Sequence, residues 1–289
     1  MAFDPFLYVA FALGFLVGRL VRRRSRWVSR ATMLTVVLLV GLLGASLRNV
    51  AVESLAVTVP VALGFALLVL GLTAIVSLLL ARLRPAAREP GPLAEAKERF
   101  PLSFVLLGAV LAGFGIGRWV ALPTDVGITW TLYVLLALVA FDLPLRWAGL
   151  ENVWVPLTAA VAGALAAGAL FALLSGTALS VALGTSLAFG WYTLAGPLVL
   201  ARAGAVLGLL AFLTNFLREN LTMVLSPVVG PRLRGEGLSA LGGATAMDTT
   251  LYFVTRYGDR EAGSLALACG LVLTVSASLV VPLVLALPM

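Results

Sequence analysis

Long apolar runs follow one another along the chain, and too few charges separate them to cover a water-soluble surface. Charged residues make up 11% of the 289 positions and hydrophobic residues 61%, whereas soluble domains are about 25% charged. A membrane-spanning helix needs roughly 20 apolar residues to cross about 30 Å of hydrocarbon. The sequence therefore predicts an all-α polytopic membrane protein embedded in a lipid bilayer.

The apolar runs predict about eight to ten transmembrane helices. Ten runs lie at residues 5–20, 31–47, 55–81, 102–122, 128–145, 153–174, 178–200, 203–229, 239–255 and 262–287. Those between 178 and 255 are rich in Gly, Pro, Ser and Thr, so we expect broken or re-entrant segments in the C-terminal half. Irregular backbone is tolerated at that depth only where protein or a water-filled cavity covers it.

The arginines predict the orientation of the chain. Cytoplasmic loops carry an excess of Lys and Arg, and residues 19–26, at the end of the first run, contain five arginines. We therefore expect the N-terminus to lie outside, on the side opposite the cytoplasm. Because the charges follow the apolar run, residues 5–20 are expected to be a retained span, not a cleaved signal peptide. If every run crosses, Arg232 and Arg234 fall outside, an exception that a non-crossing neighbouring run would remove.

One polar linker interrupts the apolar runs. It covers residues 82–100 and combines charges with Pro85, Pro90 and Pro92, residues that end regular structure. We therefore expect an N-terminal three-span bundle at 1–81, a cytoplasmic linker at 82–100 and a C-terminal transport bundle at 101–289. The functional core of that bundle is expected at about 185–255.

Two glycine motifs indicate an internal repeat. Gly14-Phe-Leu-Val-Gly18 resembles Gly113-Phe-Gly-Ile-Gly117, and each motif lies near the end of an apolar run. The second copy lies three spans after the first, an odd number, so the copies would face opposite ways, as in the inverted repeats of many transporters. The alternative is that both motifs are simply small-xxx-small contacts between helices.

Most kinds of enzyme site are excluded or unsupported. The chain has no histidine and one cysteine, Cys269, in an apolar run, which leaves no His-containing triad, His metal site or CxxC metal motif. No GxSxG or P-loop motif is present. We expect no enzyme activity, no metal and no cofactor. The net charge is +7, but the arginines lie between apolar runs and form no continuous face for nucleic acid.

Two carboxylates lie near the middle of apolar runs. Glu219 is in the run 203–229 and Asp248 in the run 239–255, whereas the other acidic residues lie at or near run ends or in loops. A charge at the centre of a membrane helix costs about 2.5–3.5 kcal/mol on insertion scales. We therefore expect both acids to be functional.

Polar neighbours accompany both acids. Asn215 lies four residues before Glu219 and shares its helix face, and Thr245 lies three residues before Asp248. Arg218 precedes Glu219 directly, so on a regular helix it points about 100° away. In a purely structural alternative, Arg218 neutralises one of the acids and pins two helices, although an apolar pair would pack them more cheaply.

A third polar segment precedes the acids. Trp191 and Tyr192 are followed by Gly196-Pro197, which should break a helix. The two aromatics would suit an interfacial belt; alternatively, a broken helix end could present backbone N–H groups to a substrate carboxylate. Thr249 adds a hydroxyl beside the second acid. These residues complete the candidate binding site.

Buried carboxylates of this kind can exchange protons for a cation. Desolvation raises the pKa of a carboxylic acid, and a nearby cation lowers it. Such a group holds a proton in one state and releases it when a cationic ligand arrives. Chemistry alone leaves the cargo open, so a metal cation–proton antiporter and a non-transporting structural subunit of a membrane complex remain alternatives.

Three segments together resemble the signature stretches of the LysO family of bacterial lysine exporters. They are Gly190-Trp-Tyr-Thr-Leu-Ala-Gly-Pro197, Asn215-Phe-Leu-Arg-Glu-Asn220 and Gly242-Gly-Ala-Thr-Ala-Met-Asp248-Thr-Thr. The resemblance implies a bacterial inner-membrane protein that exports L-lysine and its toxic analogue thialysine, driven by proton exchange. It also implies eight full spans, both termini periplasmic, a pair of intramembrane segments, and functional acids at Glu219 and Asp248. Tyr252 departs from the family pattern, which has a proline at that place, and this leaves the substrate range in doubt.

The residues also allow a mechanism and a partner to be expected. Glu219 and Asp248 would line a water-accessible cavity, where the ammonium groups of lysine displace protons. The lysine carboxylate would meet Arg218 or a broken helix end. A homodimer is also expected, because many Gly and Ala helix faces are available for close packing.

Overall fold

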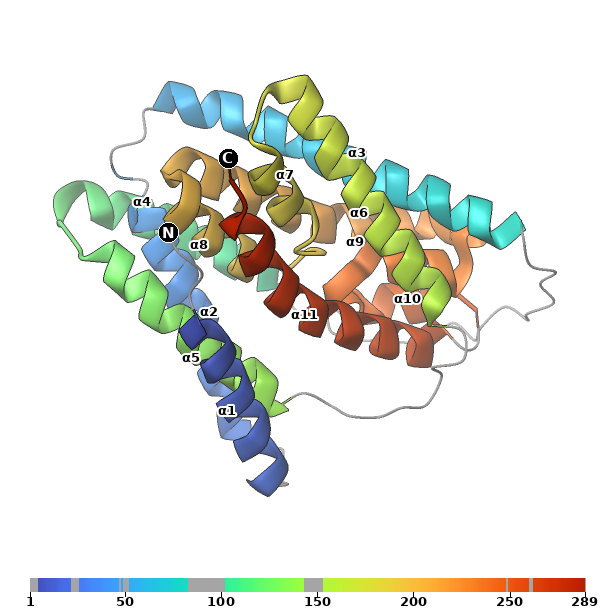
Figure 1. The fold of residues 1–289 in the computed structure, drawn as a ribbon, viewed down its shortest axis with the longest axis horizontal. Coiled ribbons are helices and arrows are strands. Elements are labelled where there is room, and N and C mark those ends of the chain that lie inside the picture. The colour runs from blue at the N-terminus through green and yellow to red at the C-terminus, as the bar shows by residue number, and fades with distance from the viewer. Residues whose placement is uncertain are drawn as a thin grey trace.

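The computed structural model describes residues 5–21, 26–46, 48, 52–82, 102–142, 153–247, 249–259 and 262–288. The regular elements of this part of the chain are all helical (Figure 1). They are α1 (Pro5–Val21), α2 (Arg26–Ser46), α3 (Val52–Arg82), α4 (Leu102–Trp119), α5 (Thr124–Asp142), α6 (Trp154–Ser175), α7 (Leu179–Ser186), α8 (Tyr192–Ala203), α9 (Ala205–Gly242), η3 (Gly243–Met247), α10 (Leu251–Tyr257) and α11 (Ala262–Ala286).

Several helices are apolar and long enough to cross a membrane. Three of them, Ala56–Arg82 within α3, α6 and α11, meet that condition by length and composition alone, and α1, α2 and α5 contain shorter apolar stretches. Leucines and valines on these helices face outward, as lipid-facing side chains do. The prediction of an all-α membrane protein is confirmed.

The two glycine motifs form close helix contacts at reciprocal places. A Cβ at Gly14 of α1 would lie 2.6 Å from the Cα of Ala137 in α5, and a Cβ at Gly117 of α4 would lie 2.8 Å from the Cα of Ala45 in α2. Only a residue without a side chain permits backbones this close. Thus α1 packs on α5, and α4 packs on α2.

The register of these contacts shows that the copies are inverted. Numbering rises together in both partners, from Gly14 opposite Ala137 to Gly18 opposite Phe141, so α1 and α5 run parallel. The chain reverses between α4 and α5 through a connection of four residues, 120–123. Helix α4 therefore runs antiparallel to α1. The inverted repeat and the small-xxx-small contacts, offered as alternatives by the sequence, both occur.

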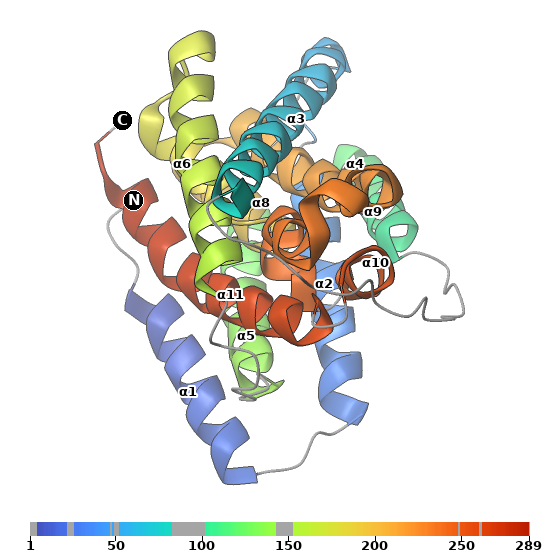
Figure 2. The same cartoon turned by 90° about the vertical axis from the view of Figure 1, so that its right-hand side faces the viewer.

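The later helices form a second layer around α9. Helix α3 packs against α6 and α9, and α8 also packs against α9 (Figure 2). Two helices of the expected three-span bundle, α1 and α2, instead pack mainly on α5 and α4. Apart from Arg82, the expected linker 82–100 lies outside the described residues, so the division into domains remains a prediction.

Two segments in this layer enter the bundle and turn back. Hairpin I comprises residues 179–203, that is α7, a tip at 187–191 and α8. Hairpin II comprises residues 235–258, that is the end of α9, a tip at 243–250 and α10. Helix α9 kinks just before hairpin II, at Arg234, where φ is 57°. It continues without interruption through Ser226 and Pro227.

The two hairpins enter from opposite ends of α11. Both arms of hairpin I approach the end of α11: Arg202 Nε donates to the carbonyl oxygen of Leu285 at 2.8 Å, and a Cβ at Gly184 would lie 2.7 Å from the Leu285 side chain. Both ends of hairpin II lie at the start of α11, since Cβ atoms at Gly235 and Gly258 would lie 2.6 and 2.7 Å from the Cβ of Ala262.

The hairpin tips meet beside the middle of α11. The backbone N–H of Ala244 in hairpin II donates to the carbonyl oxygen of Phe189 in hairpin I at 2.9 Å. A Cβ at Gly270 of α11 would lie 3.1 Å from the carbonyl oxygen of Ala244. The expected broken segments therefore turn back within the bundle, and the eight full spans implied by the family resemblance remain a prediction.

Candidate functional site

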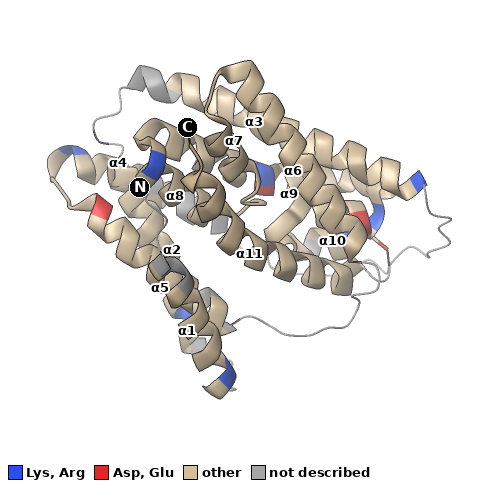
Figure 3. Cartoon of the chain, viewed as in Figure 1, with Lys and Arg blue, Asp and Glu red and all other residues tan. Residues whose placement is uncertain are grey.

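The central part of α9 faces both hairpin tips with a row of polar side chains. Asn215 and Arg218 are each 1% exposed, Glu219 is 3% exposed and Thr222 is fully buried. Figure 3 shows that the other described charged residues lie mainly towards the ends of helices. Helix α9 therefore brings a cation and an anion into the interior of the bundle, where the two hairpins end.

Asn215 holds the tip of hairpin I. Its Oδ1 accepts from the backbone N–H of Gly190 at 2.9 Å, and its Nδ2 donates to the carbonyl oxygens of Thr185 at 2.9 Å and Ala211 at 3.0 Å. Because an N–H can only donate and a carbonyl only accept, these partners fix the orientation of the amide. Both N–H bonds of Nδ2 are used, so Asn215 supports the tip more than it offers groups to a ligand.

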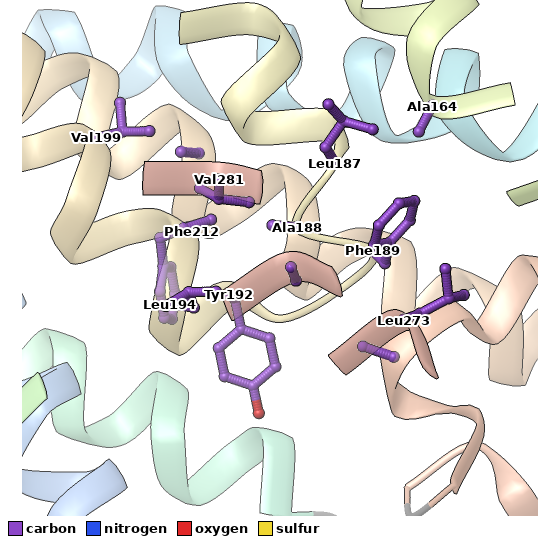
Figure 4. Close-up of a cluster of buried hydrophobic side chains, with 14 of the residues drawn as sticks. Ala164, Leu187, Ala188, Phe189, Tyr192, Leu194, Val199, Phe212, Leu273 and Val281 are labelled. Carbon is purple, nitrogen blue, oxygen red and sulfur yellow. The ribbon is translucent and has the colours of Figure 1, made fainter. Parts of the chain in front are cut away.

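The tip of hairpin I has a backbone that few residues adopt. Phe189 has φ 53° and Gly190 has φ 92°, a region that glycine enters without steric cost. The Phe189 side chain is 2% exposed and lies in an apolar cluster with Leu187 and with Leu273 of α11 (Figure 4). The chain reversal is thus fixed by the polar Asn215 on one side and by apolar packing on the other.

Arg218 holds the tip of hairpin II. Its Nε donates to the carbonyl oxygen of Leu241 at 3.3 Å, and its Nη2 donates to that of Ala240 at 3.2 Å. These carbonyls belong to the last turn of α9, where the helix dipole places partial negative charge. The guanidinium carbon also lies 6.0 Å from the ring centre of Phe189, so this one cation touches both tips.

Thr222 completes the attachment of hairpin II. Its hydroxyl donates to the carbonyl oxygen of Arg218 at 2.8 Å and lies 3.4 Å from that of Leu241. Sequence patterns alone did not reveal the roles of Ala240, Leu241 and Phe189, because they contribute backbone carbonyls or an aromatic face. The glycines that follow each of these segments, Gly190 and Gly242-Gly243, were the available signal.

Of the two candidate acids, only Glu219 belongs to the described part of the chain. Glu219 lies on α9, buried next to Arg218. Asp248 lies outside the described residues. Its chain neighbours Met247 and Thr249 belong to the tip of hairpin II. Thr249 is half-buried.

Thr245 lies at the junction of the two tips. Its hydroxyl donates to the carbonyl oxygen of Gly242 at 2.9 Å, and the Thr245 and Thr250 hydroxyl oxygens lie 3.5 Å apart. A Cβ at Gly190 would lie 3.6 Å from the Thr245 methyl group. The structure thus brings Thr245 close to Gly190 and Asn215, residues that are far from it in sequence.

The aromatic residues of the third segment begin α8. The half-buried Trp191 donates from Nε1 to the hydroxyl of Thr193 at 2.9 Å. Tyr192 is 8% exposed and meets Phe212 and Phe216 of α9 edge-on, with ring centres 5.4 and 5.7 Å apart. Tyr192 therefore packs on the same helix that carries the polar row.

The break expected at Gly196-Pro197 is wrong. Helix α8 continues through Pro197, and the chain reverses earlier, at Phe189 and Gly190. A proline removes only one helical hydrogen bond, whereas a reversal needs the positive φ angles found at the tip. Gly196 instead gives close packing, because a Cβ there would lie 3.0 Å from that of Phe212.

Metal-binding side chains do not gather in the described part of the chain. No cluster of three or more His, Cys, Asp or Glu side chains that could hold a metal ion occurs there. What the site presents is one buried cation, one buried carboxylate and several helix-end carbonyls. Such an arrangement can accommodate a ligand that carries both positive and negative groups.

Known proteins are similar in sequence to this region of the chain. The sequence model of the family described as "Lysine exporter LysO" matches residues 102–285. The Escherichia coli protein "Lysine exporter LysO" is 31% identical over 194 residues, which are 64% of this chain and 63% of that protein. A "Putative lysine exporter" of Haemophilus influenzae is 30% identical over 180 residues, 59% of this chain and 89% of that protein.

These matches have a limited extent. The chain matches less than two thirds of the length of the Escherichia coli protein, and the family match begins at α4, after the first copy of the inverted repeat. No solved structure matches the chain. Both re-entrant hairpins and the whole of α9 lie inside the matched region.

Proposed function

Because the chain belongs to the lysine exporter LysO family, we propose that it exports L-lysine from the cytoplasm across the bacterial inner membrane in exchange for protons. The observation that carries this proposal is the burial of Glu219 on α9, one helical turn after Asn215, whose side chain holds the tip of hairpin I. A carboxylate is expensive to keep inside a membrane, and cation transport gives it a use.

The proposed mechanism assigns the two acids to protons and ammonium groups. Protons from the periplasm neutralise Glu219 and Asp248; lysine then enters from the cytoplasm, and its ammonium groups displace the protons. Thr245 and Thr249 would contribute hydroxyl groups, and Trp191 and Tyr192 an aromatic wall. Thialysine, which carries the same charged groups as lysine, would follow the same route.

The re-entrant hairpins also support the proposed orientation. If residues 179–203 and 235–258 do not cross, Arg232 and Arg234 fall on the same side as the five arginines of residues 19–26. Excess arginine marks the cytoplasmic side. We therefore place both termini in the periplasm, with hairpin I opening to the periplasm and hairpin II to the cytoplasm.

The proposal also includes a domain plan and a homodimer. Residues 101–289 form the transport bundle, with its functional core at about 185–255; residues 1–81 and the cytoplasmic linker 82–100 precede it. The exposed glycines Gly64 and Gly71, one face of α3, have no atom within 4 Å of an added Cβ. A second copy of the chain could pack there, and light scattering of the purified protein measures whether it does.

A growth and release assay tests the function. The wild type, Glu219→Gln, Asp248→Asn and the control Asp125→Asn are expressed in a host without its own lysine exporter. Asp125 is an exposed acid in the first turn of α5. We expect thialysine resistance and lysine release with the wild type and the control, and neither with the two neutral variants at equal expression.

The results separate this function from its rivals. A wild type that neither confers resistance nor releases lysine would refute lysine export. Proteoliposomes in which a lysine gradient never moves protons would refute the coupling. Inhibition of transport by Na⁺ or divalent ions, but not by lysine, would favour a metal cation–proton antiporter. Loss of stability without loss of transport in both neutral variants would favour a structural role for the acids.

A further inference from the structure

Arg218 has a donor group that no hydrogen bond within the described part of the chain uses. Its side chain is 1% exposed, and Nε and Nη2 are hydrogen-bonded to Leu241 and Ala240. Among the described residues, Nη1 has no hydrogen-bond partner. A buried charged donor without a partner is costly, and such groups in native structures call for an explanation.

The surroundings of Nη1 suit a small anion. The guanidinium lies where both tips meet, 6.0 Å from the ring centre of Phe189. The tip of hairpin II packs closely on the guanidinium, since a Cβ at Gly243 would lie 3.0 Å from Nη2. Glu219 follows on α9 and is directed about 100° away around the helix. A cationic donor and an acid are therefore presented from one helix but in different directions.

We propose that Arg218 binds the α-carboxylate of the exported amino acid through Nη1, while Nε and Nη2 keep the tip of hairpin II on α9. This inference rests on the proposed function. Because two of its three nitrogens are already occupied, Arg218 makes a single charge-assisted hydrogen bond rather than the two-pronged contact usual for arginine and carboxylate. The acids recognise a dication, and Arg218 makes the site selective for amino acids.

Burial links this contact to movement of a hairpin. Both tips and α9 enclose Arg218, so a carboxylate reaches Nη1 only when a tip moves away. The hydrogen bond from Nη1 to the carboxylate then compensates for the contacts between Arg218 and the tip that this movement breaks. A cargo without a carboxylate cannot provide this bond, and a site built to hydrogen-bond a substrate group rejects analogues that lack it.

A competition assay with cadaverine tests the proposal. Cadaverine keeps both amines and the five-carbon chain of lysine but lacks the carboxylate. Lysine counterflow is measured in proteoliposomes containing the full chain, and unlabelled lysine or cadaverine is added as the inhibitor. For the wild type we expect half-inhibition to need at least about tenfold more cadaverine than lysine. For Arg218→Gln we expect this ratio to fall close to one.

Arg202 provides a matched control. It also donates to helix-end carbonyls, those of Leu285 and Leu287, but at the outer end of hairpin I. Arg202→Gln should keep the wild-type ratio, whereas a general effect of removing such an arginine would lower the ratio in both variants. An equal fall in both variants would overturn the proposal.

A second variant, Arg218→Lys, keeps the proposal testable if Arg218→Gln does not fold. Arg218→Lys keeps the charge, but a compact ammonium cannot reach two carbonyls and a carboxylate together, so the ratio should fall at least threefold or so. A wild-type ratio in every folded Arg218 variant would overturn the proposal, as would a wild type that cadaverine inhibits as well as lysine does. A wild type without lysine counterflow would instead show that the proposed function is wrong.

Discussion

Replacing Asn215 by leucine removes the three hydrogen bonds that hold the tip of hairpin I on α9. The backbone N–H of Gly190 and the carbonyl oxygen of Thr185 lose the partners they have in the structure. Ala211 loses less, because its carbonyl still accepts the helical bond four residues on. Leucine has nearly the shape of asparagine, so the change tests hydrogen bonding more than packing.

The expected loss of stability follows from these two groups. A buried polar group left without a partner costs about 1–3 kcal/mol, so Asn215→Leu should lower the free energy of unfolding by about 2–6 kcal/mol. Asn220, one and a half turns further along α9, is half-buried and makes one hydrogen bond, to the carbonyl oxygen of Phe216. Asn220→Leu should cost less than about 1 kcal/mol.

The assay is unfolding of the purified protein in mixed micelles, followed by tryptophan fluorescence, which includes Trp191 beside the tip. Transport is measured on the same preparations. We expect Asn215→Leu to unfold at a clearly lower denaturant concentration and to transport less, with Asn220→Leu close to the wild type. Equal midpoints for the two leucine variants would refute the idea that Asn215 fixes the tip.

Further predictions concern packing and topology. Gly117→Leu should prevent assembly of α4 on α2, because a Cβ already meets the backbone of Ala45, whereas Gly115→Leu should be tolerated, because nothing lies within 4 Å there; gel filtration of both variants checks this. With Cys269 changed to alanine, Val206→Cys should react with an impermeant maleimide from the periplasm, and Arg232→Cys only from the cytoplasm. Ten full crossings would give the reverse pattern.

Much of this fold could be predicted from residue patterns. The apolar runs located the helices, since hydropathy reports directly on which segments exclude water. The spacing of Gly14 with Gly18, and of Gly113 with Gly117, indicated both close packing and the inverted repeat. The spacing of Asn215 and Glu219 placed both on α9, buried together. These features depend on residues close together in sequence, where helix geometry alone fixes their relation.

The re-entrant course of the hairpins could not be predicted so directly. The runs 178–200 and 239–255 are as long as runs that cross, and hydropathy does not record the direction in which a chain continues after a break. The direction of hairpin I is decided by Phe189 and Gly190, whose positive φ angles reverse the chain. Arg232 and Arg234 were the other sign in the sequence that a neighbouring run does not cross, because they are an exception to the expected charge distribution if every run crosses.

The contacts of Arg218 also lay beyond the sequence. Pairing of Arg218 with an acid was one alternative that the sequence left open, and its described hydrogen bonds go instead to the carbonyls of Ala240 and Leu241. Every residue carries a carbonyl, so no pattern of side chains marks the ones that will be left at a helix end. Only the break after Gly242 makes these two available.

The second half of the fold combines a symmetric plan with an asymmetric distribution of charge. Hairpin I is followed by α9 and hairpin II by α11, and the pairs enter from opposite ends. Helix α9 carries Arg218 and Glu219 and bonds to both tips, whereas α11 meets them through small residues such as Cys269 and Gly270. Since both tips are attached to one charged helix, we expect the proposed changes of protonation and ligand there to act on both hairpins together. Charges divided between α9 and α11 would allow each hairpin to respond separately.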